Sequence, residues 1–293
     1  MKSLVSIFLL VIVCQFGLAQ EYVDLLSVQH LHQLDGADGP LPGQTRYSES
    51  ALDLLVPIVL SDAAALLTGV IAEQTTLHRT EYLFSTVYGI TLKIGANIKH
   101  TDQFHATYLL LPKLSSDLTE VNTDHLQIGG VFLGKYIVSP NFNVRFGVYA
   151  NREFFGPFLV PFAGVYLKKG NWELKGAVPI NAEASHAFME EVIRVGAVFN
   201  GINRSYFIGG VTNSYIEKSN NEVGAFGHYA LGNAILRAEF GHSVGRKLMK
   251  FDAGDGVDLA FPLKKINNNR VESGAVTPNG IYTRVSFIYR LPT

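Results

Sequence analysis

A two-residue alternation of apolar with polar or small side chains runs through this chain from Tyr22 to its end. One clear run is 236–241, in which the apolar Leu236, Ala238 and Phe240 alternate with Arg237, Glu239 and Gly241. Successive side chains of a strand point to opposite faces, so each run predicts a strand with one apolar and one mixed face. No segment shows a comparably sustained helical period, and the chain is therefore expected to be all-β.

The composition narrows the class of β protein. Charged residues make up 17% of the chain, below the roughly 25% of average soluble domains. Beyond residue 19, however, no stretch approaches the ~18 consecutive apolar residues of a transmembrane helix. A membrane β-barrel satisfies both observations, because its lipid-facing side chains are apolar and its lumen-facing ones are polar. The formal net charge of −1 argues against nucleic-acid binding, which needs a basic face.

The alternating runs predict one antiparallel up-and-down transmembrane barrel of about fourteen strands, with twelve as the alternative. The expected strands are 22–32, 46–59, 65–78, 82–98, 103–113, 125–138, 143–153, 157–168, 171–180, 188–199, 204–215, 222–231, 234–244 and 279–291. Pro161 falls inside one of them. Because proline cannot donate to a β-ladder, we expect a bulge or a local break in pairing there.

The connections between these strands differ in length according to their order. The longest, 33–45, 114–124 and 245–278, are the first, fifth and thirteenth. Turn signals at 139–142, 170–171, 200–203 and 232–233 are the sixth, eighth, tenth and twelfth. A barrel inserted in one orientation has short periplasmic turns and longer external loops. We also expect a loop such as 245–278 to turn inward and narrow the lumen.

The first nineteen residues have the pattern of a cleaved signal peptide. Lys2 is followed by an apolar run over 4–13 and by small residues before a cleavage site between Ala19 and Gln20. The predicted domains are thus a signal peptide, 1–19, and a barrel, 20–293. The alternatives are an uncleaved anchor, for which the run is short, and a lipoprotein signal at Cys14, where Val13 stands in place of a small residue.

An exported barrel predicts a location in the outer membrane of a Gram-negative bacterium. Its partners there are outer-membrane lipids and, during biogenesis, the barrel-insertion machinery. The last expected strand, 279–291, is rich in aromatics, as is typical of the final strand that this machinery reads, although the chain ends in Leu-Pro-Thr. Aromatic residues near other strand ends suit the headgroup level of a membrane.

The central part of the chain, 104–215, also carries landmarks of a known family. They are Gly-Val-Tyr at 147–149, Pro-Phe-Leu-Val-Pro at 157–161, Gly-Val-Tyr at 164–166, Trp-Glu-Leu at 172–174 and Pro179. These segments resemble a Bacteroidetes family with a domain of unknown function, presumed to be outer-membrane β-barrels. The resemblance implies the same fold and location, and it implies no catalytic residues.

Six charged residues are expected to face the lumen under the alternation. Placing Arg or Lys on the lipid face at mid-membrane costs about 2–4 kcal/mol, so inward placement is favoured. Such residues either set selectivity for a solute or form a network that stiffens the barrel, and the sequence leaves both open. They are Arg145, Arg194, Arg237, Glu239, Arg284 and Arg290.

Two groups of residues are weaker candidates for metal binding. His30 and His32 share a strand face but lack a third ligand, so two lumen or rim histidines are favoured. Asp252, Asp255 and Asp258 lie among glycines, but their spacing is not that of an EF-hand. We therefore expect neither a metal nor a cofactor.

No catalytic motif supports an enzyme. Four histidines lie near expected strand ends, where a membrane-embedded hydrolase would place its base, namely His78, His105, His186 and His242. However, Gly-x-Ser-x-Gly is absent. The leading hypothesis is a passive pore or small-solute transport barrel. The alternatives are a non-conducting structural or binding barrel that displays external loops, and, less favoured, a hydrolase.

Overall fold

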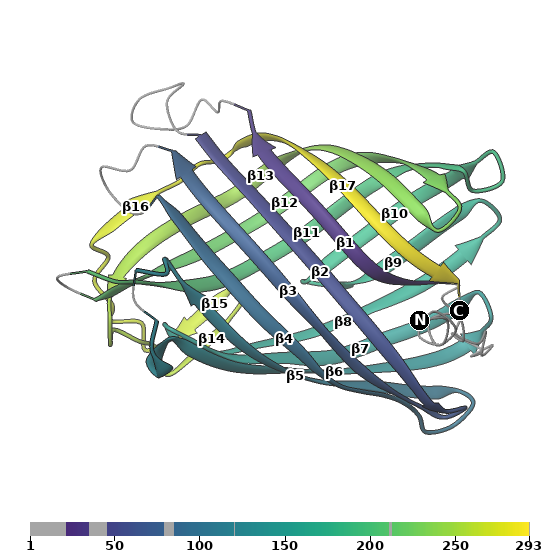
Figure 1. Ribbon diagram of the computed structural model, residues 1–293, viewed down its shortest axis with the longest axis horizontal. Coiled ribbons are helices and arrows are strands. Elements are labelled where there is room, and N and C mark those ends of the chain that lie inside the picture. Colours follow the sequence, from purple (N-terminus) through teal and green to yellow (C-terminus); the bar gives the residue numbers. More distant parts are fainter. Residues whose placement is uncertain (1–21, 35–45, 79–84, 120, 211–212, 293) are drawn as a thin grey trace, which may run out of the picture.

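The computed structural model describes residues 22–34, 46–78, 85–119, 121–210 and 213–292, which form a closed antiparallel barrel of fourteen wall strands (Figure 1). The wall consists of β1 (Tyr22–Gln33), β2 (Arg46–Ser61), β3 (Ala64–His78), β4 (Thr86–Lys99), β5 (Phe104–Ser116), β6 (Leu126–Ser139), β7 (Phe142–Glu153), β8 (Gly156–Lys169), β9 (Trp172–Val178), β10 (Asn181–Phe188), β11 (Ile193–Ile208), β12 (Ser214–Leu231), β13 (Ala234–Asp252) and β17 (Gly280–Pro292). A short 3-10 helix, η1 (Thr123–His125), precedes β6.

Each wall strand pairs with its neighbour in the chain, and the first strand pairs with the last. His30 of β1 lies opposite Val285 of β17, and β17 pairs on its other side with β13. This closure leaves no open edge around the barrel as a whole and confirms the predicted up-and-down fold. Among the described residues, no helix is long and apolar enough to cross a membrane.

The side-chain alternation sorts into an outer apolar face and an inner polar face. On β2, the exposed Leu52, Val56 and Ile58 point outward, whereas Glu49 and Asp53 form ion pairs with lysines of other strands. The same arrangement repeats around the wall. Apolar side chains that remain exposed on the outside of a closed barrel are those that lipid covers.

The two ends of the barrel differ as the sequence predicts, with one error. The turns at 140–141, 170–171 and 232–233 lie at one end, together with the first residue of β1 and the last of β17. The longer connections, of which the structure describes 117–119, 121–125 and 253–279, lie at the other end (left in Figure 1), which we call the loop end. The first connection falls mostly on residues outside the described ranges, and so does the predicted signal peptide with its cleavage site.

The predicted turn at 200–203 is wrong. These residues lie inside β11, and the tenth connection is 189–192, where Met189, Glu190 and Glu191 have positive φ angles. The predicted strands 188–199 and 204–215 are displaced accordingly, whereas 222–231 lies inside β12 and shares its end. The Asn-Gly signal was overridden because Gly201 continues the ladder opposite Asn221 of β12. Gly201 also donates a backbone hydrogen bond to Ile180 O at 2.8 Å.

The prediction at Pro161 is confirmed as a local break in pairing. Its register with β7 is regular, with Pro161 opposite Val148. On the other side, β9 ends at Val178, which lies opposite Ala163, so Pro161 lies beyond the end of β9. A proline suits a strand edge because that edge needs no donor.

The long loop 253–279 adds three short strands at the loop end: β14 (Leu259–Phe261), β15 (Lys264–Ile266) and β16 (Gly274–Val276). β14 runs parallel to the end of β8, where Ala260 lies opposite Phe158, and β16 extends the edge of β13. This loop therefore packs against wall strands rather than supplying the expected inward constriction.

The constriction comes instead from the hairpin of β11 and β12. Beyond Asn200, both faces of β11 become enclosed, and Ser205, Tyr206, Phe207 and Ile208 are all buried. Phe207 pairs with Ser116 of β5, a strand far around the wall. The segments 201–210 and 213–220, which we call the crossing hairpin, thus lean into the barrel.

The sequence supplies a reason for this bend. The outward positions of β11 are apolar up to Phe199 and then become polar at Asn203 and Ser205. The outward positions of β12 change in the same way at Asn221 and Ser219. Polar side chains facing lipid would lack hydrogen-bond partners, whereas inside the barrel they find them.

Candidate functional site

Two adjoining cavities occupy the barrel interior below the crossing hairpin. The larger, which we call the apolar cavity, has a volume of about 590 Å³. The second, which we call the charged cavity, has a volume of about 430 Å³ and lies toward the end that carries the short turns. Arg145, Gly176 and Asn181 line both cavities, so the two meet at these residues.

The apolar cavity has an unusual wall for a barrel lumen. Inward positions of a transmembrane barrel are generally polar. Here β5, β6 and β8 direct large apolar side chains into the interior, namely Leu111, Val131, Leu133, Val160 and Phe162. Ile71 of β3 and Ile202 of β11 add to the same wall. Such a surface favours a solute that brings apolar surface of its own.

Paired charges line the other cavity. Glu183 bonds Arg237 at 2.7 Å and lies 3.3 Å from the ammonium of Lys175. Asp24 accepts from Arg290 at 2.6 Å near the barrel end. Because these charges are paired with opposite ones, this part of the lumen offers polar contacts rather than a field of one sign.

The crossing hairpin is held to the β5–β7 side of the barrel by Glu153. This buried carboxylate accepts from Ser205 N at 2.8 Å and from Ser205 Oγ at 2.5 Å. Gln127 also donates to Ser205 Oγ at 3.1 Å, and the Phe207 ring stacks on His125 with centroids 3.8 Å apart.

On the other side of β4, the hairpin binds β2 and β3. Lys218 lies 2.7 Å from Glu49 and donates to Thr75 at 3.3 Å, while Tyr206 donates to Glu73 at 3.0 Å. Arg204 forms an ion pair with the same Glu73. The hairpin is therefore tethered to wall strands on either side of β4, across the lumen from β11, and obstructs the lumen at the loop end.

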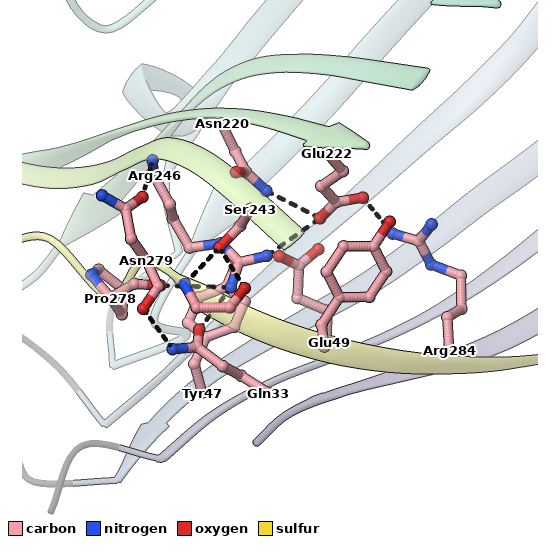
Figure 2. Close-up of polar contacts among 12 residues, drawn as sticks. Gln33, Tyr47, Glu49, Asn220, Glu222, Ser243, Arg246, Pro278, Asn279 and Arg284 are labelled. Carbon is pink, nitrogen blue, oxygen red and sulfur yellow. Dashed lines mark hydrogen bonds and ion pairs between the residues drawn. The ribbon is translucent and has the colours of Figure 1, made fainter. Parts of the chain in front are cut away.

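A buried cluster next to these contacts joins β1, β2, β12, β13 and β17 (Figure 2). Glu222 is fully buried and bonds two guanidinium groups, that of Arg246 at 3.1 Å and that of Arg284. Arg246 also donates to Gln33 at 2.6 Å and lies with its Cζ 4.1 Å from the centre of the Tyr47 ring. We call this set the Glu222 cluster.

The six charged residues singled out in the sequence all lie on inner-face positions, and four of them belong to one chain of ion pairs. Arg237, Glu239 and Arg284 form one connected group, in which Glu239 accepts from Arg284 at 2.8 Å. Arg194, 3.5 Å from Glu173, joins this group through Lys175 and Glu183, whereas Arg290 pairs with Asp24. Arg145 stands at the junction of the cavities, bonded to Asn143 and over the Tyr166 ring.

Glu222 and Arg246, the most buried charges of the interior, were not among those six. Arg246 escaped prediction because the expected strand ended at 244, whereas β13 continues to Asp252 through an irregularity in its register with β12. The crossing hairpin also went unpredicted. The switch from apolar to polar outward positions in β11 and β12 is the sequence signal that would have indicated it.

Salt bridges also dock the long loop onto the barrel. Arg270 bonds both Tyr215 and Glu217 at 2.9 Å, and Lys265 forms an ion pair with Glu217. Burial lowers the pKa of Lys265, and the charge of Glu217 offsets part of that effect. The docked loop covers the outside of the crossing hairpin.

The candidate metal ligands are not brought together. His30 and His32 are exposed, and His30 Nδ1 lies 2.9 Å from Ser50 Oγ. The aspartates of the long loop also lie apart from the histidines, with Asp258 bonded to Asn267. Within the described ranges, no three His, Cys, Asp or Glu residues are placed to hold a metal ion.

The rim histidines are dispersed as well. His105 is buried at an inner-face position, whereas His186 packs against Trp172 and Phe188, and His242 is exposed. The side chain of His78 lies outside the described set. Three of the four therefore do not meet at one catalytic centre.

Comparison with solved structures found barrels of the outer membrane. The chain is similar to an outer membrane channel from Pseudomonas putida F1, with 10% identity, a TM-score of 0.41, and 92% and 95% of the two chains covered. It is also similar to the CymD monoaromatic hydrocarbon channel, with 12% identity, a TM-score of 0.36, and 94% and 90% covered. No family model and no curated protein sequence matched.

The location follows from three features of the barrel: its closure, its number of strands and its lipid-covered outer face. An even number of antiparallel strands with an apolar outer band is the architecture of barrels in the bacterial outer membrane. The chain is an outer-membrane β-barrel. The predicted location is confirmed.

Proposed function

We propose that this barrel transports a small solute with substantial apolar surface, by way of the apolar cavity and then the charged cavity. The observation that carries the proposal is the apolar wall of the larger cavity. A general pore for hydrated solutes gains nothing from Leu133 or Phe162 in its lumen, whereas a binding cavity for an apolar solute needs such side chains. The charged cavity provides the route onward.

The size of the cavity sets the scale of the solute. A volume of about 590 Å³ lies within the range of roughly 300–1,000 Å³ that small-molecule sites have. The solute is therefore a small molecule rather than a polymer. Its passage along the charged cavity would exchange contacts among Arg145, Lys175 and Glu183.

The crossing hairpin argues against a wide passive pore. It is tethered to Glu153 on one side and to Glu49 and Glu73 on the other, where hydrated ions would have to pass. The alternative of a binding barrel that does not release its solute shares the apolar cavity. The two functions differ in whether bound solute leaves through the charged cavity.

Binding is tested with the dye phenylnaphthylamine, which fluoresces in apolar surroundings, and the purified barrel in lipid nanodiscs. We expect saturable binding that Leu133→Lys weakens tenfold or more, because a buried charge replaces apolar contact. The matched control is Asn97→Lys, which also changes the lumen but lies outside both cavities. Equal affinity in both variants would contradict the proposal.

Release is tested with the same dye enclosed in proteoliposomes. Transport predicts faster transfer to an external acceptor with the barrel than without it, and Lys175→Glu should slow that transfer because three carboxylates would then meet. A barrel that binds the dye but does not change its transfer rate would favour the binding function instead.

A further inference from the structure

A row of basic side chains crosses four neighbouring strands on the inner face of the barrel. Lys99 of β4 lies opposite His105 of β5. Lys135 of β6 lies between His105 on one side and Arg145 of β7 on the other. Residues directly opposite each other share a face of the sheet, so all four side chains belong to the same face. That face is the lumen, because Arg145 lines both cavities. We call these four residues the basic row.

The basic row lies near the end that carries the short turns. Lys99 is the last residue of β4, and the turn at 140–141 joins the strands of Lys135 and Arg145. Lys135 is half-buried, whereas its neighbour His105 is buried. Water and small solutes that reach the lumen from this end therefore meet Lys135 first among the residues of β6 that carry a charge.

Two members of the row place like charges side by side. Lys135 and Arg145 are directly opposite each other, an arrangement that destabilises a sheet. Lys99 has an acidic partner, because its ammonium lies 2.7 Å from a carboxylate oxygen of Asp102. Lys135 forms no ion pair with any carboxylate in the part of the chain that the structure describes. The repulsion at Lys135 is therefore not offset by an acidic side chain of the described residues.

Other carboxylates of this part of the lumen are bonded to other cations. Glu183 lies 2.7 Å from Arg237 and 3.3 Å from Lys175. Glu173 lies 3.3 Å from the same Lys175 and 3.5 Å from Arg194. The basic row thus adds positive charge to a lumen whose carboxylates are already paired, and the side formed by β5–β7 attracts anions.

Two buried nitrogens beside the charges also have no hydrogen-bond partner. Asn143 precedes Arg145 by two residues on the same face and is fully buried. Its Oδ1 accepts from Arg145 Nε at 3.1 Å, so its Nδ2 is a donor, and this donor has no acceptor among the described residues. The same holds for Nε2 of His105, which lacks any described partner. A buried donor without an acceptor is costly, and an anion supplies acceptors.

We propose that the basic row binds an oxyanion such as phosphate, held by Lys135 and Arg145 with Asn143 Nδ2 as a further donor. Ammonium and guanidinium groups are the usual partners of phosphate, and charge-assisted hydrogen bonds are the strong ones. The oxyanion is either a free ion or an anionic group carried by the transported solute. The site itself does not depend on the proposed function, because the basic row and the unpartnered donor define it.

The test measures anion binding through the stability of the barrel. A ligand that binds only the folded state lowers the unfolding equilibrium constant. The barrel is unfolded with urea in phosphatidylcholine vesicles, in sodium phosphate or in sodium chloride of equal ionic strength and pH. We expect about 50 mM phosphate to lower the unfolding constant of the parent at least tenfold more than that of Lys135→Met. The matched control is Lys247→Met, an exposed lysine of β13 that should respond like the parent and shares any general effect of phosphate.

Three further results distinguish an anion site from a structural lysine. In chloride, Lys135→Met should be more stable than the parent, because the repulsion is removed. Lys135→Arg, which keeps the charge, should keep the phosphate effect. Asn143→Asp places a carboxylate beside the row and should imitate the bound anion, with higher stability in chloride and no response to phosphate. Equal phosphate effects in the parent and in Lys135→Met, or a loss of stability on Lys135→Met in chloride, would overturn the proposal.

The two sources of the oxyanion are separated with butyl phosphate, with butanol as the control for its alkyl chain. Stabilisation by butyl phosphate tenfold above that by phosphate supports a site for an anionic group on the solute. Equal stabilisation supports a site for the free ion. The dye assays report on the apolar cavity alone, so their failure would reject the proposed solute and leave the oxyanion site to be decided by Lys135→Met.

Discussion

Replacing Glu222 by Gln should destabilise the barrel strongly. Glu222 and Arg246 have no exposed side-chain area, so solvent does not screen their contact. The substitution leaves Arg284 paired with Glu239 at 2.8 Å, but it leaves Arg246 with the neutral acceptors Gln33 and Pro278 O. One buried guanidinium thus loses its carboxylate partner.

Removing one partner of a buried ion pair costs about 3–5 kcal/mol. At about 1.36 kcal/mol for each power of ten, the unfolding equilibrium constant should rise by roughly two to four powers of ten. The measurement is urea unfolding in lipid vesicles, followed by the fluorescence of Trp172. Heat-dependent mobility in gels, which separates folded from unfolded barrels, gives an independent readout.

Two further variants separate this explanation from a general sensitivity to mutation. Asp102→Asn removes the exposed pair with Lys99 at 2.7 Å and should change the stability little, because surface pairs contribute little. The double variant Glu222→Gln/Arg246→Met removes the unpaired charge and should regain much of the lost stability. A loss below about 1 kcal/mol for Glu222→Gln, or a double variant no more stable than the single one, would refute the reasoning.

Two other variants test the wall and the crossing hairpin. Gly147→Leu should prevent folding, because a Cβ there would lie 2.0 Å from Phe132 O and 2.6 Å from the Phe162 ring, whereas Gly227→Ala, with open space around its Cβ, should fold normally in the gel assay. Glu153→Ala should release Ser205 and produce bursts of ion conductance in planar bilayers that the parent and the outward control Arg152→Ala lack. Conductance of the parent equal to that of Glu153→Ala would show that the hairpin is no obstruction.

The sequence by itself determined the barrel, because lipid imposes its alternation on every strand separately. The inward orientation of Arg237, between an outward Leu236 and Ala238, can be predicted without knowing any partner strand. The same local rule marked the break at Pro161, since a missing backbone donor is a property of the residue itself. Turn residues were a less reliable signal. At 200–203 they predicted a turn, but these residues pair with β12 instead.

The tertiary structure decided what the barrel encloses. The crossing hairpin depends on Glu153 and Glu73 meeting a segment some fifty and more than a hundred residues away in the chain, respectively. The missing ladder partner of residues 159–162 depends on two neighbours of β8, one too short and one turned inward, and neither leaves a signature at those residues themselves. The alternation in the sequence shows which face of a strand meets lipid. The shape of the interior depends instead on where strands that are distant in the sequence end relative to one another.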